Sequence, residues 1–319
     1  MNSPQRVLIT GATGFIGKAL VQTLSEAGFH VVLATRRNVE ELDGRENRLF
    51  KLDEDITPSL VDIDVVIHTA ARAHVLKETS LDPAREFRIQ NADATRRLAR
   101  AAAKAGVKRF IFLSSIGVNG NSTRPGQAFR ADDVPAPVEP YAISKLEAER
   151  ALMEECIGAS MEWVIIRPPL VYGPGAKGNF ERMSRALLRH WPLPFGAIEN
   201  RRSFVALENL TDLLKCCTTH TSAPEQVLLA ADSENYSTAG WLTIMAKGAG
   251  VRAHIVFLPE PWLRYFARWI GKRGVIKKLC ESLVVDIGPT QARLGWQPRV
   301  KAPEVIGKAV RSFTNEGNK

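Results

Sequence analysis

Tyr141 and Lys145 are the residues whose types and spacing point most directly to chemistry. They are four residues apart just after Pro140, and on a helix side chains at i and i+4 lie on one face. A lysine ammonium beside a phenol lowers the pKa of the phenol from its usual value of about 10, which assists proton transfer. Tyr141 is therefore a candidate proton donor, and Lys145 is the candidate group that tunes it.

Ser115 is the third candidate for the same reaction. It follows the apolar run 110–113, which is typical of a buried strand. Ser114 and Ser115 would then emerge at the carboxyl end of that strand, where ligands bind in open α/β sheets. A hydroxyl there can hold a substrate carbonyl while Tyr141 donates the proton. The alternative for either serine is turn capping.

A glycine-rich turn near the start of the chain predicts a dinucleotide site. The strand-like run 7–10 is followed by Gly11, Gly14 and Gly17 and then by a helical pattern. The first glycine would allow a tight turn, the second would let the backbone approach a pyrophosphate, and the third would let the helix pack closely. The spacing is G-x-x-G-x-x-G rather than G-x-G-x-x-G, so a purely structural turn is the alternative.

The end of the second expected strand indicates which dinucleotide would bind. An NAD enzyme usually places an acid there to bind the ribose hydroxyls, but this chain has Thr35, Arg36 and Arg37. Two guanidinium groups can pair with a 2′-phosphate. We therefore expect NADP, with NAD less favoured. The alternative is that both arginines cover the adenine or face solvent.

Apolar runs that alternate with helical periodicity predict an α/β fold, a doubly wound parallel sheet of the Rossmann type. A dinucleotide-binding domain is expected at 1–168, with later segments returning to it, and a smaller substrate-binding lobe at 169–319. Strands are expected at 7–10, 31–35, 49–52, 65–68, 110–113 and 163–167, and helices at 85–105 and 141–155.

Composition narrows the class of protein. A chain of 319 residues with 45% hydrophobic content suits a globular enzyme with a real core. No apolar run is long enough to span a membrane and no leader pattern occurs, so a cytoplasmic location is expected. Cysteines at 156, 216, 217 and 280 lack the spacing of metal or redox sites. We therefore expect no metal and no disulfide.

The net charge of +9 is concentrated in one segment, because 252–278 holds seven Lys or Arg against Glu260. Aromatic residues recur there at helical spacing, so an amphipathic helix is expected. The first interpretation is an aromatic core face with a solvated basic back. The alternatives are membrane-surface contact through 261–278 and an oligomer contact. Nucleic-acid binding is not indicated, since no recognised module accompanies the charge.

Motifs over nearly the whole chain resemble the extended short-chain dehydrogenase/reductase family. They are the glycine turn, His68 to Ala71, Asn91, Ser114-Ser115, Tyr141 with Lys145, Arg167 to Pro174 and Leu294 to Pro298. The resemblance is greatest to bacterial nucleotide-sugar 4-epimerases and 4-ketoreductases of surface-polysaccharide (O-antigen) synthesis. It implies a catalytic set of Ser115, Tyr141 and Lys145, with Lys145 also holding the nicotinamide ribose, and a homodimer.

The resemblance also implies binding residues. Those for the cofactor are Gly11, Thr13, Gly14, Phe15, Ile16, Gly17, Arg36, Arg37, Asp55, Ile56, Ala70, Ala71, Tyr141, Lys145 and Pro168. Those for the substrate are Ser115, Asn119, Asn179, Phe180 and Arg202. Asn91 resembles an asparagine that braces the active-site loop. His68 and His74 are given no catalytic role, because a lone histidine at a strand end is more often structural.

The activity that the resemblance implies is NADPH-dependent reduction of the C4 ketone of a UDP-4-keto-6-deoxy-N-acetylhexosamine. Ile116 and Gly117 stand where 4,6-dehydratases carry an Asp-Glu pair, so elimination of water is not expected. Three alternatives stay open. They are a UDP-hexose 4-epimerase with bound NAD, a reductase of flavonoid-like or steroid ketones, and a non-enzymatic dinucleotide-sensing protein on the same fold.

Overall fold

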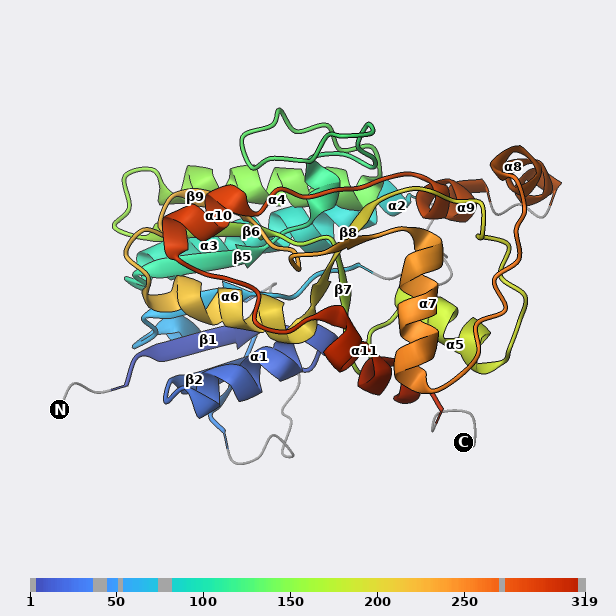
Figure 1. The fold of residues 1–319 in the computed structure, drawn as a ribbon. Helices are drawn as coiled ribbons and strands as arrows, with labels where there is room; N and C mark the ends of the chain where they lie inside the picture. Colours follow the sequence, from blue (N-terminus) through green and yellow to red (C-terminus); the bar gives the residue numbers. More distant parts are fainter. Residues whose placement is uncertain (1–3, 37–44, 51–53, 74–81, 270–272, 315–319) are drawn as a thin grey trace.

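A seven-stranded parallel sheet forms the centre of the first lobe in the computed structural model, which describes residues 4–36, 45–50, 54–73, 82–269 and 273–314 (Figure 1). The strand order is β3-β2-β1-β4-β5-β6-β9. The strands are β1 (Arg6–Thr10), β2 (His30–Thr35), β3 (Asn47–Leu49), β4 (Val65–His68), β5 (Arg109–Leu113), β6 (Glu162–Arg167) and β9 (Gln226–Leu229). The strands predicted at 7–10, 31–35, 65–68, 110–113 and 163–167 are therefore present, with ends that differ by a residue or so. The strand predicted at 49–52 shares only Leu49 with β3, and residues 51 and 52 lie outside the described part of the chain.

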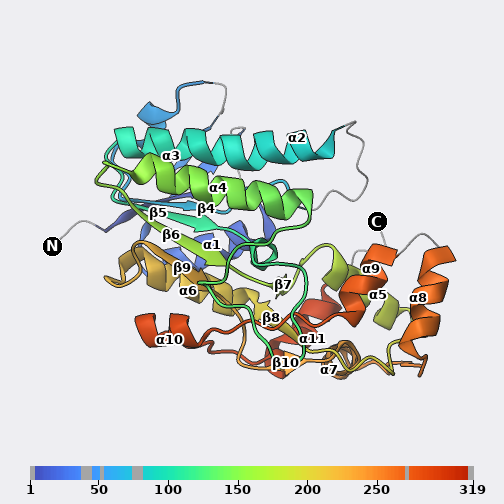
Figure 2. The same ribbon diagram turned by 90° about the horizontal axis from the view of Figure 1, so that it is seen from above.

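Helices cover both faces of this sheet, as Figure 2 shows from above. One face packs against α1 (Phe15–Glu26), α6 (Leu207–Thr219) and α10 (Gly288–Leu294), and the other against α3 (Ala94–Lys104) and α4 (Pro140–Cys156). A parallel strand buried on both faces must be apolar along its length, and β4 and β5 are buried throughout. The doubly wound Rossmann-type fold expected from the sequence is confirmed.

The helix expected at 85–105 forms as one continuous stretch with an irregular turn inside it. It begins with α2 (Pro83–Phe87), widens into the π-helical turn η2 (Arg88–Asp93) and continues as α3. Periodicity does not reveal such a turn, because the apolar pattern continues on both sides of it. π-turns inside α-helices are frequent at functional sites, and Asn91 lies in this one.

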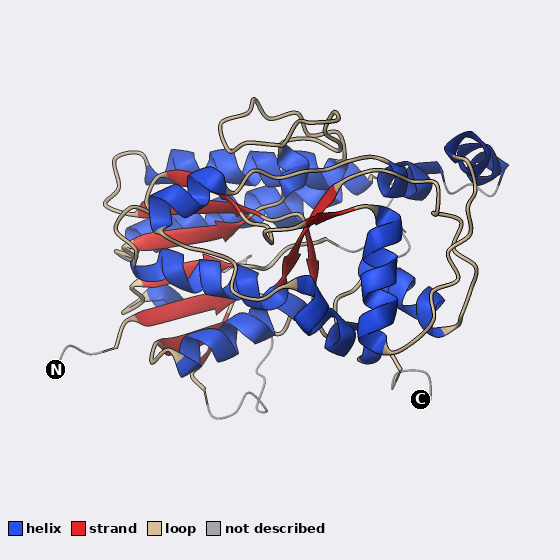
Figure 3. Cartoon of the chain, in the orientation of Figure 1, coloured by secondary structure: helices blue, strands red, loops and turns tan. Residues whose placement is uncertain are grey.

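The second lobe is built on a small sheet and a group of helices (Figure 3). Its sheet has the order β10-β8-β7. The strands are β7 (Leu170–Tyr172), β8 (Arg202–Ala206) and β10 (Asn235–Tyr236), and the helices are α5 (Asn179–Leu188), α7 (Thr238–Ala249), α8 (Glu260–Trp269), α9 (Arg273–Cys280) and α11 (Ala302–Arg311). Aromatic rings fill its core, where Trp241 stacks on Phe204 with ring centroids 3.9 Å apart.

The chain passes between the two lobes more than once. After β8 it returns through α6 to β9, which pairs in parallel with β6 of the large sheet. The sequence Leu294 to Pro298 has a structural role in this return. Gly295 ends α10 with a φ of +60°, and the indole N–H of Trp296 donates to Asp212 on α6 over 3.1 Å. This motif therefore ties the late segments to the first lobe.

The expected amphipathic helix forms as α8, but its aromatic face does not lie in the core. Trp262, Tyr265, Phe266 and Trp269 are between 51% and 75% exposed. Among the α8 side chains that the structure describes, Leu263 is buried, at 5% exposed. The core interpretation of this face is therefore wrong: the helix attaches to the lobe through the side that carries Leu263.

Candidate active site

The glycine turn has the geometry that a close backbone approach requires. Gly11 has a φ of +71°, a conformation that side chains disfavour. A Cβ on Gly17 would lie 2.1 Å from the carbonyl oxygen of Gly11, so the start of α1 packs directly on the turn. A Cβ on Gly11 would lie 2.8 Å from the backbone nitrogen of Ala70, which follows β4. The glycine turn is thus packed closely between α1 and the residues that follow β4.

This turn also provides donors for an anion. The N-cap of α1 is Gly14, which has no capping side chain, and the first turn of the helix contains no acid. The first N–H groups of a helix lack partners within the helix and carry partial positive charge. Thr13 and Gly14 are exposed, and Phe15 and Ile16 are partly exposed. The described residues therefore fit the pyrophosphate of a dinucleotide.

The structure brings Ser115, Tyr141 and Lys145 to the carboxyl edge of the same sheet. Ser115 follows β5, and Tyr141 and Lys145 lie one turn apart at the start of α4. The ring of Tyr141 contacts that of Phe87 edge to face, with centroids 6.0 Å apart. The ammonium of Lys145 lies 4.0 Å from the ring centre of Phe112 on β5.

The lowered pKa expected for Tyr141 beside Lys145 is wrong. Burial raises the pKa of Tyr141 to about 12 and lowers the pKa of Lys145 to about 7, against the opposing effect of Glu149. Desolvation penalises the charged form of each group, which is the phenolate in one case and the ammonium in the other. The phenol is therefore protonated at neutral pH, which suits a proton donor.

The two serines after β5 take different roles. The hydroxyl of Ser115 accepts from the backbone N–H of Gly117 over 3.2 Å and caps the short helix η3 (Ile116–Val118). That bond uses a lone pair of the oxygen and keeps the hydroxyl proton for a ligand oxygen. The hydroxyl of Ser114 donates to the carboxylate of Glu149 over 2.5 Å. Ser114 is thus part of the support, while Ser115 remains a candidate substrate contact.

A buried ion pair behind these residues was missed by the sequence reasoning. Arg167, at the end of β6, binds both carboxylate oxygens of Glu149 on α4 at 2.9 and 2.6 Å. The side chains are only 4% and 1% exposed. Glu149 lies at i+4 from Lys145, and a charged residue at the end of a buried strand needs a partner. The spacing of Glu149 and the position of Arg167 at a strand end were the sequence features from which this ion pair could have been predicted.

Asn91 and His68 hold the neighbouring backbone in place. The amide of Asn91 accepts from the N–H of Arg72 over 2.8 Å and donates to the hydroxyl of Ser144 over 3.0 Å, so it joins the segment after β4 to α4. His68 is buried between the hydroxyls of Thr10 and Thr95 at 2.6 and 3.1 Å. Burial lowers the pKa of His68 to about 3, so the imidazole is neutral and structural. His74 lies outside the described residues.

The remaining cofactor residues lie around the same edge. Arg36 is exposed at the end of β2, and Ala70 and Ala71 follow β4. The carboxylate of Asp55 accepts from the N–H of Thr57, which holds its pKa below the ordinary value. Ile56 and Pro168 are buried, and Arg37 lies outside the described residues. The contacts predicted for these residues stay predictions.

The residues expected to bind the substrate are mostly buried or already hydrogen-bonded within the protein. Asn119 is buried, with its amide bound to Arg167 at 3.0 Å and to the carbonyl of Arg130 at 2.7 Å. Arg202 donates to the carbonyls of Lys278 and Glu281 at 2.5 and 2.8 Å, so it holds the end of α9. Asn179 begins α5 and is partly exposed. For Asn119 and Arg202 the contacts seen here are structural.

Phe180 needs a correction. It is 0% exposed and lies in the core of the second lobe, with its ring centroid 6.1 Å from that of Tyr172 and 6.3 Å from that of Phe313. A large aromatic side chain is drawn into the core by its apolar area. Direct contact of Phe180 with a substrate does not fit this position.

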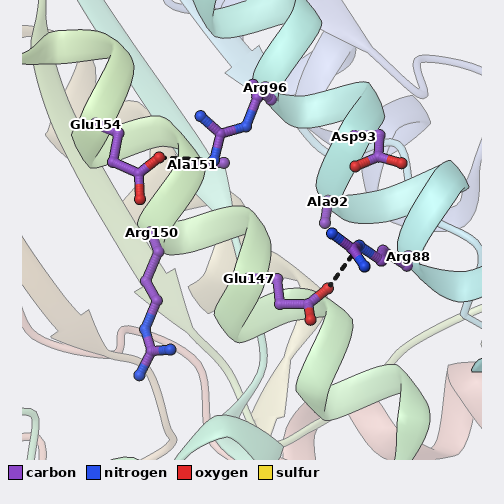
Figure 4. Close-up of a pocket in the computed structure, with 8 residues that line it drawn as sticks. All are labelled: Arg88, Ala92, Asp93, Arg96, Glu147, Arg150, Ala151 and Glu154. Atoms are coloured by element: carbon purple, nitrogen blue, oxygen red, sulfur yellow. Dashed lines mark hydrogen bonds and ion pairs between the residues drawn. The ribbon is translucent and has the colours of Figure 1, made fainter.

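A groove of about 210 Å³ lies between η2, α3 and α4 (Figure 4), and Ser115, Tyr141 and Lys145 are not among the residues that line it. Its charged side chains pair across it, Arg88 with Glu147 at 3.8 Å and Arg96 with Glu154 at 2.6 Å. Figure 4 shows these pairs reaching from one helix to the other. The groove carries no group that the proposed chemistry uses. Across the described part of the chain, no cluster of His, Cys, Asp or Glu could hold a metal ion.

Comparison with known proteins identifies the family. The family model "NAD dependent epimerase/dehydratase family" matches residues 7–230. UDP-glucose 4-epimerase of Vibrio cholerae is 38% identical over 99% of this chain and 98% of its own length. A protein named UDP-glucose 4-epimerase from Mycolicibacterium smegmatis is 29% identical over 98% of this chain and 99% of its length.

Solved structures agree with the fold. MoeE5 in complex with UDP-glucuronic acid and NAD is 26% identical, with a TM-score of 0.79 over 98% of this chain and 99% of that one. UDP-glucuronic acid 4-epimerase from Bacillus cereus in complex with NAD is 22% identical, with a TM-score of 0.80 over 98% and 99%. From the glycine turn and these matches together, the chain belongs to the NAD dependent epimerase/dehydratase family.

Proposed function

We propose that this protein transfers a hydride between a nicotinamide dinucleotide and C4 of a UDP-sugar. The observation that carries the proposal is the position of Ser115, Tyr141 and Lys145 at the sheet edge where the glycine turn ends β1. Ligands in doubly wound folds bind at that edge. The sugar and its C4 position are taken from the relatives that are named UDP-glucose 4-epimerase and from neighbours that hold UDP-sugars.

Each residue has a definite task in this reaction. A bound dinucleotide would supply or accept the hydride; Gly11, Gly14 and the start of α1 would hold its pyrophosphate, and Lys145 its ribose. In the reducing direction, Tyr141 gives its proton to the oxygen at C4 as the carbonyl becomes an alcohol. Ser115 donates a hydrogen bond to the same oxygen and stabilises its developing charge.

More specifically, we propose that the cofactor is NADPH and that the reaction is reduction of a UDP-4-keto-6-deoxy-N-acetylhexosamine, a precursor of surface polysaccharide. Arg36 supports it, since it is exposed at the end of β2 where an NAD enzyme usually has an acid. Ile116 and Gly117 offer no acid and base for elimination of water, which argues against a dehydratase.

The second candidate is a UDP-hexose 4-epimerase with bound NAD. The Vibrio cholerae relative and the NAD-bound epimerase structure favour it. Such an enzyme oxidises C4 and reduces it again from the other face, so Tyr141 would act first as base and then as acid. The same residues serve both candidates, and they differ in the net use of cofactor.

One experiment separates the candidates. The protein is mixed with NADPH and a UDP-4-keto-6-deoxy-N-acetylhexosamine, and separately with UDP-glucose and NAD. Loss of NADPH in proportion to alcohol formed supports the reductase. Interconversion of UDP-glucose and UDP-galactose without net cofactor change supports the epimerase. Tight cofactor binding with no turnover of either sugar would contradict both and leave a dinucleotide-sensing protein.

Cofactor choice has its own test in Arg36→Ala. One lost charged hydrogen bond of about 1.5–3 kcal/mol should weaken NADPH binding by roughly tenfold to a hundredfold. NADH lacks the 2′-phosphate, so its affinity serves as the internal control and should stay the same. Equal losses for both cofactors would show that Arg36 contacts the adenosine that they share and does not select NADP.

We also propose a cytoplasmic homodimer that pairs through helices including α4. The charged groove of Figure 4 lies between that helix and the η2–α3 stretch, where a partner could cover it. Sedimentation velocity on the full chain measures the assembly state. A single species with the mass of one chain at micromolar concentration would contradict the dimer.

A further inference from the structure

The aromatic face of α8 is exposed at the edge of the second lobe. Trp262 is 57% exposed, Tyr265 51%, Phe266 51% and Trp269 75%. Figures 1 and 2 both place α8 at the end of the molecule away from the large sheet. An exposed group of large aromatic side chains is informative, whereas single exposed apolar residues are ordinary.

The four rings contact one another along the helix. Trp262 lies against Tyr265 and Phe266 with ring centroids 6.3 Å away in each case, and Tyr265 lies 6.2 Å from Trp269. Residues at i, i+3, i+4 and i+7 share one side of a helix. Leu263 fastens the helix to the lobe from another side. The rings therefore form one continuous apolar strip.

Basic side chains line the groove between α8 and α9. This groove of about 560 Å³ includes Arg264, Arg268 and Lys277 in its walls. Glu260 pairs with Arg264 at 2.6 Å, and Lys277, whose side chain is 63% exposed, lies 3.7 Å from the carboxylate of Glu281. The segment 252–281 as a whole carries seven Lys or Arg and two Glu. An excess of positive charge thus lies next to the apolar strip.

We propose that α8 and α9 dock this protein on the surface of an anionic lipid bilayer. Trp and Tyr prefer the boundary between headgroups and acyl chains, because each apolar ring also carries an N–H or O–H group, and Phe adds apolar area to such a face. A helix with such a face and nearby Lys and Arg lies in the plane of the interface. Ten residues of helix are about 15 Å long, too short to cross a bilayer. No described helix meets the requirements for a span.

Charge favours lipid over a second copy of the chain. A symmetric dimer places the same patch on both partners, so the basic residues of this segment would face each other. Like charges brought together in an interface are unfavourable. An anionic bilayer instead attracts basic residues near its surface and releases them as salt rises.

The docking helices are held to the rest of the protein by polar contacts. The ammonium of Lys278 on α9 pairs with Glu139, the residue before α4, at 2.6 Å. Arg202 on β8 binds the carbonyls of Lys278 and Glu281. The end of α9 is thus joined to both lobes, so the strip is presented on a fixed support and does not have to fold when it meets lipid.

The test uses the full chain and vesicles of phosphatidylcholine, with or without phosphatidylglycerol. We expect the protein to sediment with the anionic vesicles, to be released by high salt, and to stay in solution with phosphatidylcholine alone. Tryptophan fluorescence should shift to the blue on binding, since Trp262 and Trp269 leave water. No binding to anionic vesicles would overturn the proposal.

Variants assign the binding to the strip and to the charge. Arg268→Gln with Lys277→Gln should weaken vesicle binding by about fivefold for each side chain. Trp262→Ala with Trp269→Ala should weaken it and abolish the blue shift. Trp191→Ala is the matched control, since Trp191 is 55% exposed but outside α8, and it should bind as the unchanged protein does. Equal weakening by Trp191→Ala would overturn the assignment to α8.

Two further readouts complete the test. All these variants should keep the sugar-dependent activity measured without vesicles, which shows that they fold. Sedimentation velocity compares them for self-association. A concentration-dependent dimer that Trp262→Ala with Trp269→Ala removes, together with no vesicle binding, would assign the strip to a second copy and overturn the lipid proposal. Because vesicle binding is measured without substrate, its failure leaves the proposed function standing.

Discussion

Helices α4 and α8 depart from the usual amphipathic pattern in opposite ways. On α4, Ser144, Lys145 and Glu149 are buried, although such residues are seldom buried without partners. On α8, Trp262 and Trp269 are mostly exposed. The first helix bears the proposed catalytic groups and the second bears the proposed docking strip. On α4 the buried Lys145 carries a proposed catalytic role and Glu149 supports it, and on α8 the exposed rings carry the proposed docking role.

The comparison also shows what stabilises each departure. Lys145 and Glu149 are enclosed by Phe112 and Arg167, and a buried charge is kept only where a partner offsets its desolvation. The rings on α8 contact one another and remain at least half exposed. Changes on α4 should therefore affect catalysis and stability strongly, whereas changes on α8 should leave both nearly unchanged in the absence of lipid.

The largest effect is expected for Tyr141→Phe. Removing the proton donor should lower kcat by about 10²–10⁴-fold, the usual range for general acid catalysis. Affinity for NADPH, measured by fluorescence titration, should stay within about twofold, because the ring is kept. Full turnover in this variant would refute Tyr141 as the acid and remove the main reason for treating α4 as the catalytic helix.

The second largest effect is expected for Glu149→Gln, on the stability of the fold. It leaves the guanidinium of Arg167 buried without its charge partner, which should lower the free energy of unfolding by about 3–5 kcal/mol. Urea denaturation measures this. The matched control on the same helix is Glu154→Gln, whose partner Arg96 is exposed, with an expected loss of about 0–1 kcal/mol. Equal losses for the two variants would break the contrast between buried and exposed charge.

The pKa of Lys145 predicts a pH dependence of intermediate size. Its value is about 7 in the folded protein and near its ordinary 10.5 in the unfolded chain. Between these values the unfolded chain binds one more proton, so the free energy of unfolding should rise with pH from about 7 to 10, by up to about 1.4 kcal/mol per pH unit. Lys145→Met should flatten this rise. A profile that the substitution leaves unchanged would contradict the burial of a neutral lysine.

The smallest effect is expected on α8. Trp269→Ala should change the free energy of unfolding by no more than about 0.5 kcal/mol, because an exposed side chain loses little packing. Trp241→Ala, in the core of the same lobe, should cost about 3–5 kcal/mol. A loss on α8 as large as the one at Trp241 would mean that the strip packs against the lobe in solution. It would contradict the contrast between the buried groups of α4 and the exposed rings of α8.

Much of the first lobe was predictable from local patterns. The strand 65–68 was predicted with the bounds of β4, and the glycine turn was placed between β1 and α1. Strong apolar runs and glycines that must adopt special geometry are local signals. They can therefore be recognised without knowing which distant residues pack against them. The spacing of Tyr141 and Lys145 on one helix face is local in the same sense.

What could not be predicted depends on contacts distant in sequence. The Glu149–Arg167 pair joins α4 to β6, and Asn119 is occupied by Arg167 and Arg130. The pKa of Tyr141 is raised because other elements bury the phenol, which the spacing of Tyr141 and Lys145 does not reveal. Phe180 was expected at the substrate, but its ring completes the core of the second lobe. The π-turn at Asn91 also has no signature in the apolar pattern.

By itself the sequence determined the doubly wound sheet, the dinucleotide turn, and the order and spacing of the proposed catalytic residues, because periodicity and glycine geometry act over a few neighbouring residues. Only the tertiary structure decided which polar groups are desolvated and which aromatic groups remain in water. Both depend on what the rest of the chain brings against a given face. The charge state of Tyr141 and Lys145 and the exposure of α8 are therefore properties of the folded molecule.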